Sequence, residues 1–300
     1  MHPLIRPLTE IKPLRDPILI AGFADNSGTT AAAAAAYLVE LWGGKPLADF
    51  DPEELFDFTS RRPFARQEDG ERIVDWPTSR IFVASPEGAD RDVLILVGVE
   101  PHLRWRSFCE AVASIMRETG ATESVTFGSY PAPTPHTRAV PVRLSASDLE
   151  FGRKFGMEPA PSAYEGPIGI TGVLNVALGK EFRTASLSTM TPFYVGAEQN
   201  PHAIMTLVQL IDRGLGTSTP LSLLTEAAVA LDHQAALAVQ ESQPLQAIVQ
   251  SLEQQFDGLS ISGPILIAPT DVETELPSSE DLIADLEQFL RAQDTGRNAA

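Results

Sequence analysis

The stretch PILIAGFADNSGTTAAAAAAYLVEL, residues 17–41, decides the fold of this chain. It opens on an almost wholly apolar run, turns through the polar residues 25–30, and continues into a run of alanines. A short apolar run predicts a strand covered on both faces of its sheet, and consecutive alanines strongly favour a helix. We therefore expect a buried strand over 17–23, a turn, and a helix over 29–41.

The same alternation continues along the chain. Further strands are predicted at 81–84, 93–99, 124–127, 139–144 and 187–195. Further helices are predicted at 105–119, 169–178 and 201–213. Strands that alternate with helices are typical of α/β folds in which helices cover both faces of the sheet. We expect a three-layer α/β/α sandwich with a largely parallel sheet.

The last third of the chain has a different pattern. Residues 221–240 and 244–256 are rich in alanine and leucine and predict a helical hairpin, and a last helix with one apolar stripe is predicted to start near Ser278. We divide the chain into an α/β core, residues 1–215, and an acidic helical region, residues 216–300. The helical region must pack either on the core or on a neighbouring subunit. Its apolar stripe, Leu282 to Leu290, predicts a homo-oligomer.

Charge is concentrated in the same region. The formal net charge is −18, and residues 214–290 hold 12 acidic residues and no lysine or arginine, so they contribute −12 of that total. Nucleic acid is a poor partner for such a chain, because its phosphates would be repelled. Either the acidic segment docks on a basic protein surface, or it is simply a solvated face.

Hydropathy and cysteine content indicate the compartment. No apolar run reaches the roughly 20 residues of a membrane span, and there is no basic segment followed by an apolar leader. The single cysteine, Cys109, cannot form an internal disulfide, and beside Phe108 on an expected helix it is a small core residue rather than a nucleophile. We expect a cytoplasmic protein that does not enter the membrane.

Five short motifs follow one another along the first two thirds of the chain. They are Gly22-Phe23-Ala24-Asp25, residues 51–63, residues 98–108, Pro135-His136-Thr137-Arg138 and residues 164–172. Their order and spacing, from about residue 17 to about residue 215, resemble the PAC2 family, specifically its actinobacterial branch. The resemblance implies a sandwich similar to that of the purine nucleoside phosphorylases, with a helical C-terminal extension.

Two classes of function are implied by this resemblance. Some PAC2 proteins are proteasome assembly chaperones, which bind proteasome α subunits. Others are labelled as ligases, but the glycine-rich nucleotide loop with lysines that such ligases need has no counterpart here. We expect a binding or assembly factor that works on a protein partner, with proteasome subunits as the candidate. The alternative is an enzyme that binds a nucleotide or phosphate, an analogy at the level of the fold.

A candidate ligand pocket is predicted where the loops at the carboxyl ends of the strands meet. The residues assigned to it are Asp25, Asn26, Ser27, Gly28, Arg61, Arg62, His136, Arg138 and Tyr164. Arginine suits a phosphate or carboxylate, histidine transfers protons near neutral pH, and a helix N-terminus attracts anions.

Structural explanations for the same residues stay open. Asn26 or Ser27 can cap the helix that follows, and Asp51, Asp57 and Glu100 can hold the arginines in a salt-bridge network. No cofactor is expected. No metal is expected either, because the sequence lacks a Cys/His cluster and a calcium-loop spacing.

Overall fold

The structure is a computed structural model that describes residues 2–161 and 164–260. The chain divides into two compact units, Met1–Leu266 and Ile267–Ala300, and the described residues all belong to the first. The helix predicted from Ser278, with the apolar stripe that predicted a homo-oligomer, lies outside the described residues.

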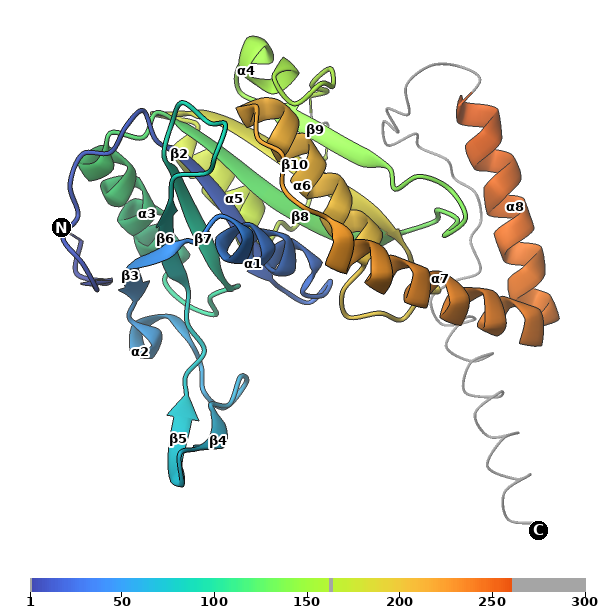
Figure 1. Cartoon of the computed structure of the whole chain (residues 1–300), viewed down its shortest axis with the longest axis horizontal. Coiled ribbons are helices and arrows are strands. Elements are labelled where there is room, and N and C mark those ends of the chain that lie inside the picture. The colour runs from blue at the N-terminus through green and yellow to red at the C-terminus, as the bar shows by residue number, and fades with distance from the viewer. Residues whose placement is uncertain (1, 162–163, 261–300) are drawn as a thin grey trace. The chain divides into compact units, whose positions relative to one another are not determined.

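An eight-stranded mixed sheet forms the centre of the fold (Figure 1). Its strands are β1 (Ile5–Pro7), β2 (Ile18–Ala24), β3 (Lys45–Phe50), β6 (Arg80–Ala84), β7 (Val93–Val99), β8 (Glu123–Ala132), β9 (Val142–Ala146) and β10 (Arg183–Pro192). Their spatial order is β1-β3-β6-β7-β2-β8-β10-β9.

Only the middle of this sheet is parallel. Strands β7, β2, β8 and β10 run parallel to one another, whereas β1, β3, β6 and β9 pair antiparallel with their neighbours. The largely parallel sheet that we predicted is therefore wrong at both edges. The reason lies in the connections, because a parallel neighbour needs a long crossover, whereas the short link from β6 to β7 returns the chain antiparallel.

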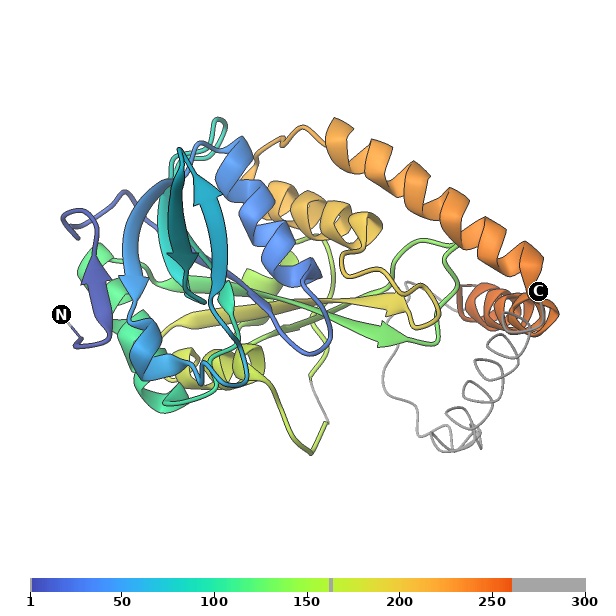
Figure 2. The ribbon, with the colours of Figure 1, turned by 90° about the horizontal axis from the view of Figure 1, so that it is seen from below.

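Helices cover both faces of the sheet (Figure 2). The described helices are α1 (Thr30–Leu41), α2 (Pro52–Leu55), α3 (Trp105–Thr119), α4 (Leu149–Arg153), α5 (Ile170–Leu178), α6 (Pro201–Leu215), α7 (Ser222–Glu241) and α8 (Gln243–Ser260). Helices α3 and α5 enclose one hydrophobic core, and α1 and α6 enclose the other. The three-layer sandwich with C-terminal helices is confirmed.

The strand–turn–helix at residues 17–41 is closely packed. All seven residues of β2 are buried, and Ala34, Ala35 and Leu38 of α1 are fully buried against the sheet. At Gly22 a Cβ atom would collide with the carbonyl oxygen of Ala31, so glycine is required where the helix crosses the strand. Small residues on both elements thus set how near α1 lies to the sheet.

A separate hairpin of β4 (Phe64–Glu68) and β5 (Glu71–Asp75) projects from the sheet between β3 and β6 (Figure 1). Its turn residues Asp69 and Gly70 both have positive φ, 49° and 85°, as a type I′ turn requires. The Asp-Gly pair between two extended runs is the sequence signal for this hairpin, which our prediction did not include.

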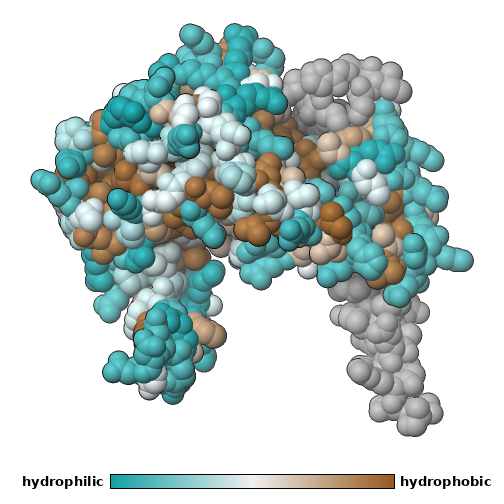
Figure 3. Space-filling view, viewed as in Figure 1, coloured by the Kyte–Doolittle hydropathy of each residue, from teal (hydrophilic) through white to brown (hydrophobic). Residues whose placement is uncertain are grey.

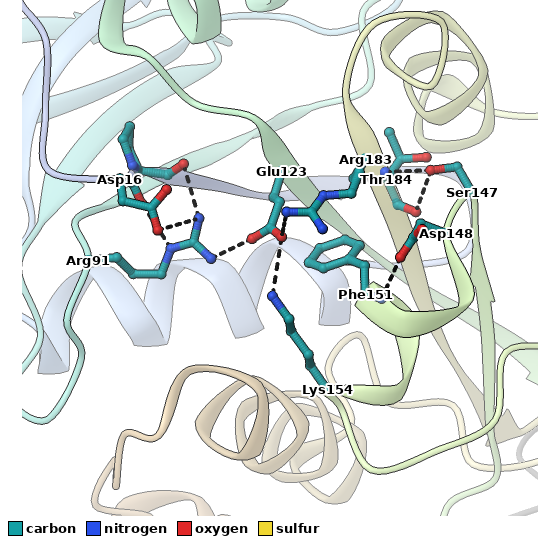
Figure 4. A network of polar contacts seen from close by, with 10 residues as sticks. Asp16, Arg91, Glu123, Ser147, Asp148, Phe151, Lys154, Arg183 and Thr184 are labelled. Atoms are coloured by element: carbon teal, nitrogen blue, oxygen red, sulfur yellow. Dashed lines mark hydrogen bonds and ion pairs between the residues drawn. The ribbon is translucent and has the colours of Figure 1, made fainter.

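A buried carboxylate ties the sheet together at the edge where the parallel strands begin (Figure 4). Glu123 is 1% exposed, and its carboxylate pairs with Arg91, with Lys154 at 3.3 Å and with Arg183 at 2.7 Å. The ring of Phe151 lies 5.6 Å from the Lys154 ammonium. The four charged side chains come from distant parts of the sequence, so this cluster forms only when the sheet is correctly assembled.

Candidate functional site

In the turn after β2, the carboxylate of Asp25 is hydrogen-bonded within the turn itself. The Asp25 side chain accepts a hydrogen bond from the amide of Ser27 at 2.8 Å, and Asp25 and Gly28 exchange backbone hydrogen bonds. Burial raises the pKa of Asp25, an effect that the amides of Ser27 and Gly28 oppose. A carboxylate in this position disfavours an anion.

The N-terminus of α1 is covered by another loop. The amide of Thr29 donates to the carbonyl of Glu198 at 3.1 Å, and the Thr30 hydroxyl accepts from the amide of Asn200 at 3.1 Å. The residue that caps α1 is Thr29, and no side chain makes a capping bond. The alternative of capping by Asn26 or Ser27 is therefore wrong, because the turn ends before it reaches the helix.

Arg61 and Arg62 lie exposed on the bend before β4. In residues 2–161 and 164–260 neither side chain has a carboxylate partner. The three acids that we expected beside them are engaged elsewhere. Asp51 pairs with Arg6, Asp57 accepts from Thr59 and Ser60, and Glu100 accepts from the amide of Ile170 at 2.7 Å. The salt-bridge network expected around these arginines is therefore not formed, because nearer donors occupy each acid.

His136 belongs to the connection between β8 and β9 and pairs with Tyr194. The Tyr194 hydroxyl accepts from the His136 amide at 2.8 Å and lies 2.7 Å from Nδ1 of the imidazole. Burial lowers the pKa of His136, and the negative charges of Asp232 and Glu253 only partly oppose this shift. The imidazole is therefore neutral at physiological pH. The ring is thus held in place by Tyr194.

Arg138 binds the acidic helix α8. Its guanidinium donates to both oxygens of Asp257 at 2.8 Å and to Glu253 at 3.2 Å, and the Thr137 hydroxyl also contacts Glu253. The hydrogen bonds with Arg138 lower the pKa of Asp257. Two carboxylates therefore neutralise the cation that we had assigned to an anionic ligand, and they attach α8 to the β8–β9 connection.

His136 and Arg138 line one small pocket together with residues of α6 and α7, among them His202 and Asp232. The space inside is about 20 Å³, enough for about one water molecule. The Thr134 hydroxyl lines it, buried and without a hydrogen-bond partner. The other seven residues of the predicted set are not part of this pocket.

Tyr164 lies apart from these groups. It is 57% exposed, and its hydroxyl donates to the carbonyl of Pro167 at 3.0 Å within its own loop. The nine residues therefore fall into separate groups: the β2 turn, the bend before β4, the β8–β9 connection and the Tyr164 loop. Ligand binding by any of these groups stays a prediction.

Four residues that the pocket prediction did not include make key contacts in this part of the structure. Tyr194 orients His136, Glu253 and Asp257 bind Arg138, and Glu100 bonds the N-terminus of α5. Their sequence signals are weak, since each acts across more than 50 positions along the chain. The acidic composition of residues 214–290 was the one hint that carboxylates would face a cation.

Cys109 is confirmed as a core residue. It is 3% exposed among the side chains beneath α3, and burial raises the pKa of its thiol to about 11. A thiol with this pKa stays protonated at neutral pH, so it is a poor nucleophile.

Two absences can be stated for residues 2–161 and 164–260. None of the helices there has both the length and the apolar character needed to cross a bilayer. Within the same residues no group of three His, Cys, Asp or Glu side chains is arranged to hold a metal ion.

The fold and these contacts define an α/β/α sandwich protein with an acidic helical extension that is attached through Arg138. The profile of the PAC2 family matches residues 19–239, more than two thirds of the sequence, and the chain belongs to the PAC2 family. The resemblance carried by the five motifs is confirmed.

Solved structures of relatives agree with this assignment. A proteasome-assembly chaperone homologue from Mycobacterium tuberculosis is 33% identical with a TM-score of 0.68, and the match covers 78% of this chain and 99% of that one. A PAC2 family protein from Streptomyces avermitilis is 32% identical with a TM-score of 0.71, covering 78% and 100%. Both organisms are actinobacteria, as the branch predicted from the motifs requires.

More distant structures share the fold alone. An archaeal proteasome activator from Pyrococcus furiosus is 17% identical with a TM-score of 0.62, and the match covers 79% of this chain and 98% of that one. No curated protein matches the sequence.

Proposed function

We propose that this protein is an assembly factor that binds proteasome subunits. The observation that carries the proposal is the 33% identity, over 78% of the chain, with a protein described as a proteasome-assembly chaperone homologue. The archaeal proteasome activator adds only a shared fold. We further propose that the protein works in the cytoplasm and as a homo-oligomer, in line with its sequence.

The chemistry of the predicted ligand residues also supports a binding factor over an enzyme. A nucleotide needs a cleft of several hundred Å³, whereas the pocket at His136 and Arg138 has room for about one water molecule. Of the three arginines in the predicted set, Arg138 is already paired with Asp257 and Glu253, and Arg61 and Arg62 do not line this pocket. Tyr194 likewise occupies the imidazole that would transfer a proton.

The test uses purified proteasome α subunits from the source organism. Mixed with the full chain at about 10 µM, they are expected to co-elute with it in size-exclusion chromatography, and the chain should accelerate the appearance of complete particles in native mass spectrometry. Arg62→Ala and His136→Ala serve as variants of the predicted pocket, and both should still bind the α subunits and accelerate their assembly. A folded chain that neither binds the subunits nor changes their assembly would contradict the proposal.

The enzyme alternative has its own readout in the same preparation. A thermal-shift series with phosphate and nucleotides should leave the melting temperature unchanged. A ligand at a hundred times its dissociation constant would stabilise the fold by about 2.7 kcal/mol, so real binding is readily detected. A shift that Arg62→Ala abolishes would favour the enzyme.

A further inference from the structure

A second cavity adjoins the small pocket at His136 and Arg138. It has a volume of about 200 Å³ and lies between the loop after β10 and the α7–α8 hairpin. Val195, Leu231 and Ala235 line both spaces, so the two spaces are neighbours across these three side chains. None of the nine residues predicted to bind a ligand lines this second cavity.

Small side chains on the inner side of α7 leave this space open. Ala235 and Ala238 line the cavity, whereas Leu223, Val229 and Leu237 of the same helix are exposed. Apolar residues are visible along α7 in the space-filling view (Figure 3). Protein interiors are normally packed without voids much larger than a water molecule, so a space of this size is one that a ligand can occupy.

The two spaces differ in polarity. Within residues 2–161 and 164–260, no charged side chain lines the larger cavity. The smaller pocket contains the Thr134 hydroxyl, which is buried without a partner, and the amide of Asn200, which is 7% exposed. The oxygen of Asn200 accepts from the amide of Ala203 at 3.0 Å. An oxygen atom placed in the smaller pocket therefore gains a hydrogen bond to Thr134 that the protein itself leaves unmade.

The charges around the smaller pocket are already balanced. Arg138 is paired with Asp257 and Glu253, and His202 lies 2.8 Å from Asp232. A further charge in a buried position is costly unless it finds a partner of its own. The group that enters the smaller pocket should therefore be polar and uncharged.

The two volumes set the size of the ligand. An apolar cavity of about 150 Å³ holds benzene, so the larger cavity has room for one ring or a short chain of about six to eight carbon atoms. The smaller pocket, at about 20 Å³, has room for one oxygen atom. We propose that this protein binds a small neutral molecule whose apolar body lies between α7 and the loop after β10 and whose hydroxyl group is bound at Thr134.

This inference does not rest on the proteasome partner. Ligand binding is measured on the isolated chain, and co-elution with α subunits tests the partner, so either can fail alone. A molecule in this position touches α7 and the loop after β10 at once, so it would strengthen the attachment of the helical hairpin to the core.

Three compounds of similar size serve as probes. Benzyl alcohol carries a hydroxyl group, toluene has none, and benzoate is charged. Ligand-observed NMR titrations of the full chain measure the dissociation constant of each compound. Benzyl alcohol should bind saturably at one site. Benzoate should bind at least tenfold more weakly, because its carboxylate finds no unpaired cation in the smaller pocket.

Two variants locate the two ends of the ligand. Ala238→Leu fills the larger cavity from an exposed position on α7 and should weaken the binding of benzyl alcohol and of toluene at least tenfold. Thr134→Val removes the hydroxyl with little change of shape, so it should weaken benzyl alcohol about three- to tenfold and leave toluene unchanged. The matched control is Ala236→Leu, at an exposed alanine of α7 that lines neither space, and it should bind like the wild type. Melting temperatures confirm that each variant is folded.

Four results would overturn the proposal. They are a wild type that does not bind benzyl alcohol, equal effects of Ala238→Leu and Ala236→Leu, benzoate that binds as tightly as benzyl alcohol, and a Thr134→Val variant that leaves benzyl alcohol unaffected or weakens toluene equally.

Discussion

At the scale of single residues, Glu123 shows how this acidic protein uses a buried charge. The carboxylate is almost fully shielded from water, which by itself raises its pKa, yet Arg91, Lys154 and Arg183 lower the pKa below the ordinary value of 4.5. A carboxylate with a depressed pKa in the folded state stabilises the fold wherever it is ionised. Its protonation therefore opposes folding.

The prediction that follows concerns Glu123→Gln. At pH 7 the substitution should lower the free energy of unfolding by about 3 kcal/mol or more, because three cations then lose their buried partner. The difference from the wild type should be complete above the unfolded pKa of about 4.5 and should shrink as the pH falls through the lower folded pKa. Urea unfolding at pH 7, 5 and 3 measures it.

The control is Glu87→Gln, a change of the same kind at an exposed acid, which should leave the unfolding curve nearly unchanged. An equal effect of the two substitutions, or a difference that grows toward low pH, would show that the cluster does not hold its charges as described.

At the scale of elements, the close approach of α1 to β2 shapes the core. Alanines on α1 and Gly22 on β2 allow a short distance between helix and sheet. Gly22→Ala should therefore destabilise the protein by about 1–3 kcal/mol, because the new Cβ meets the backbone of Ala31 and the helix must shift. Thermal unfolding with a chemical-denaturant series measures this loss.

Gly196→Ala serves as the comparison for this prediction. A Cβ at Gly196 would meet no atom within 4 Å, so this variant should unfold like the wild type. If both glycine variants were equally stable, the close contact between strand and helix would be refuted.

Helix α8 is attached to the β8–β9 connection by charged side chains. Arg138, the last residue of the Pro135-His136-Thr137-Arg138 motif, pairs with Glu253 and Asp257, which both lie on α8. The motif thus provides a docking point for the acidic helices. The imidazole of its histidine, His136, is hydrogen-bonded to the hydroxyl of Tyr194.

At the scale of the whole molecule, net charge governs association. Two chains of −18 repel each other at long range, and added salt screens that repulsion while it leaves apolar contacts nearly unchanged. The dissociation constant of the proposed homo-oligomer should therefore decrease when sodium chloride is raised from about 20 to about 200 mM, as measured by sedimentation velocity. Dissociation at high salt would mean that opposite charges hold the copies together.

Local pattern was enough to predict much of the architecture. Apolar runs and alanine- or leucine-rich periodicity depend on neighbours a few positions away, so they correctly indicated β2, β7, α1, α3, α6 and the α7–α8 hairpin. The order of short motifs identified the family for the same reason, since it can be compared position by position. Strand β1 was missed because it is a three-residue edge strand, and β3 was missed because Lys45–Phe50 shows little regular alternation of polar and apolar residues.

Only the tertiary structure decided which charges meet. The sequence by itself determined an acidic α/β sandwich of the PAC2 family, with a helical region at its C-terminal side. It could not show that Arg138 pairs with α8 or that the Glu100 carboxylate accepts a hydrogen bond from the first residue of α5. Electrostatic and packing partners are chosen by distance in space, and residues separated by 50 to 120 positions become neighbours only after the sheet order is set.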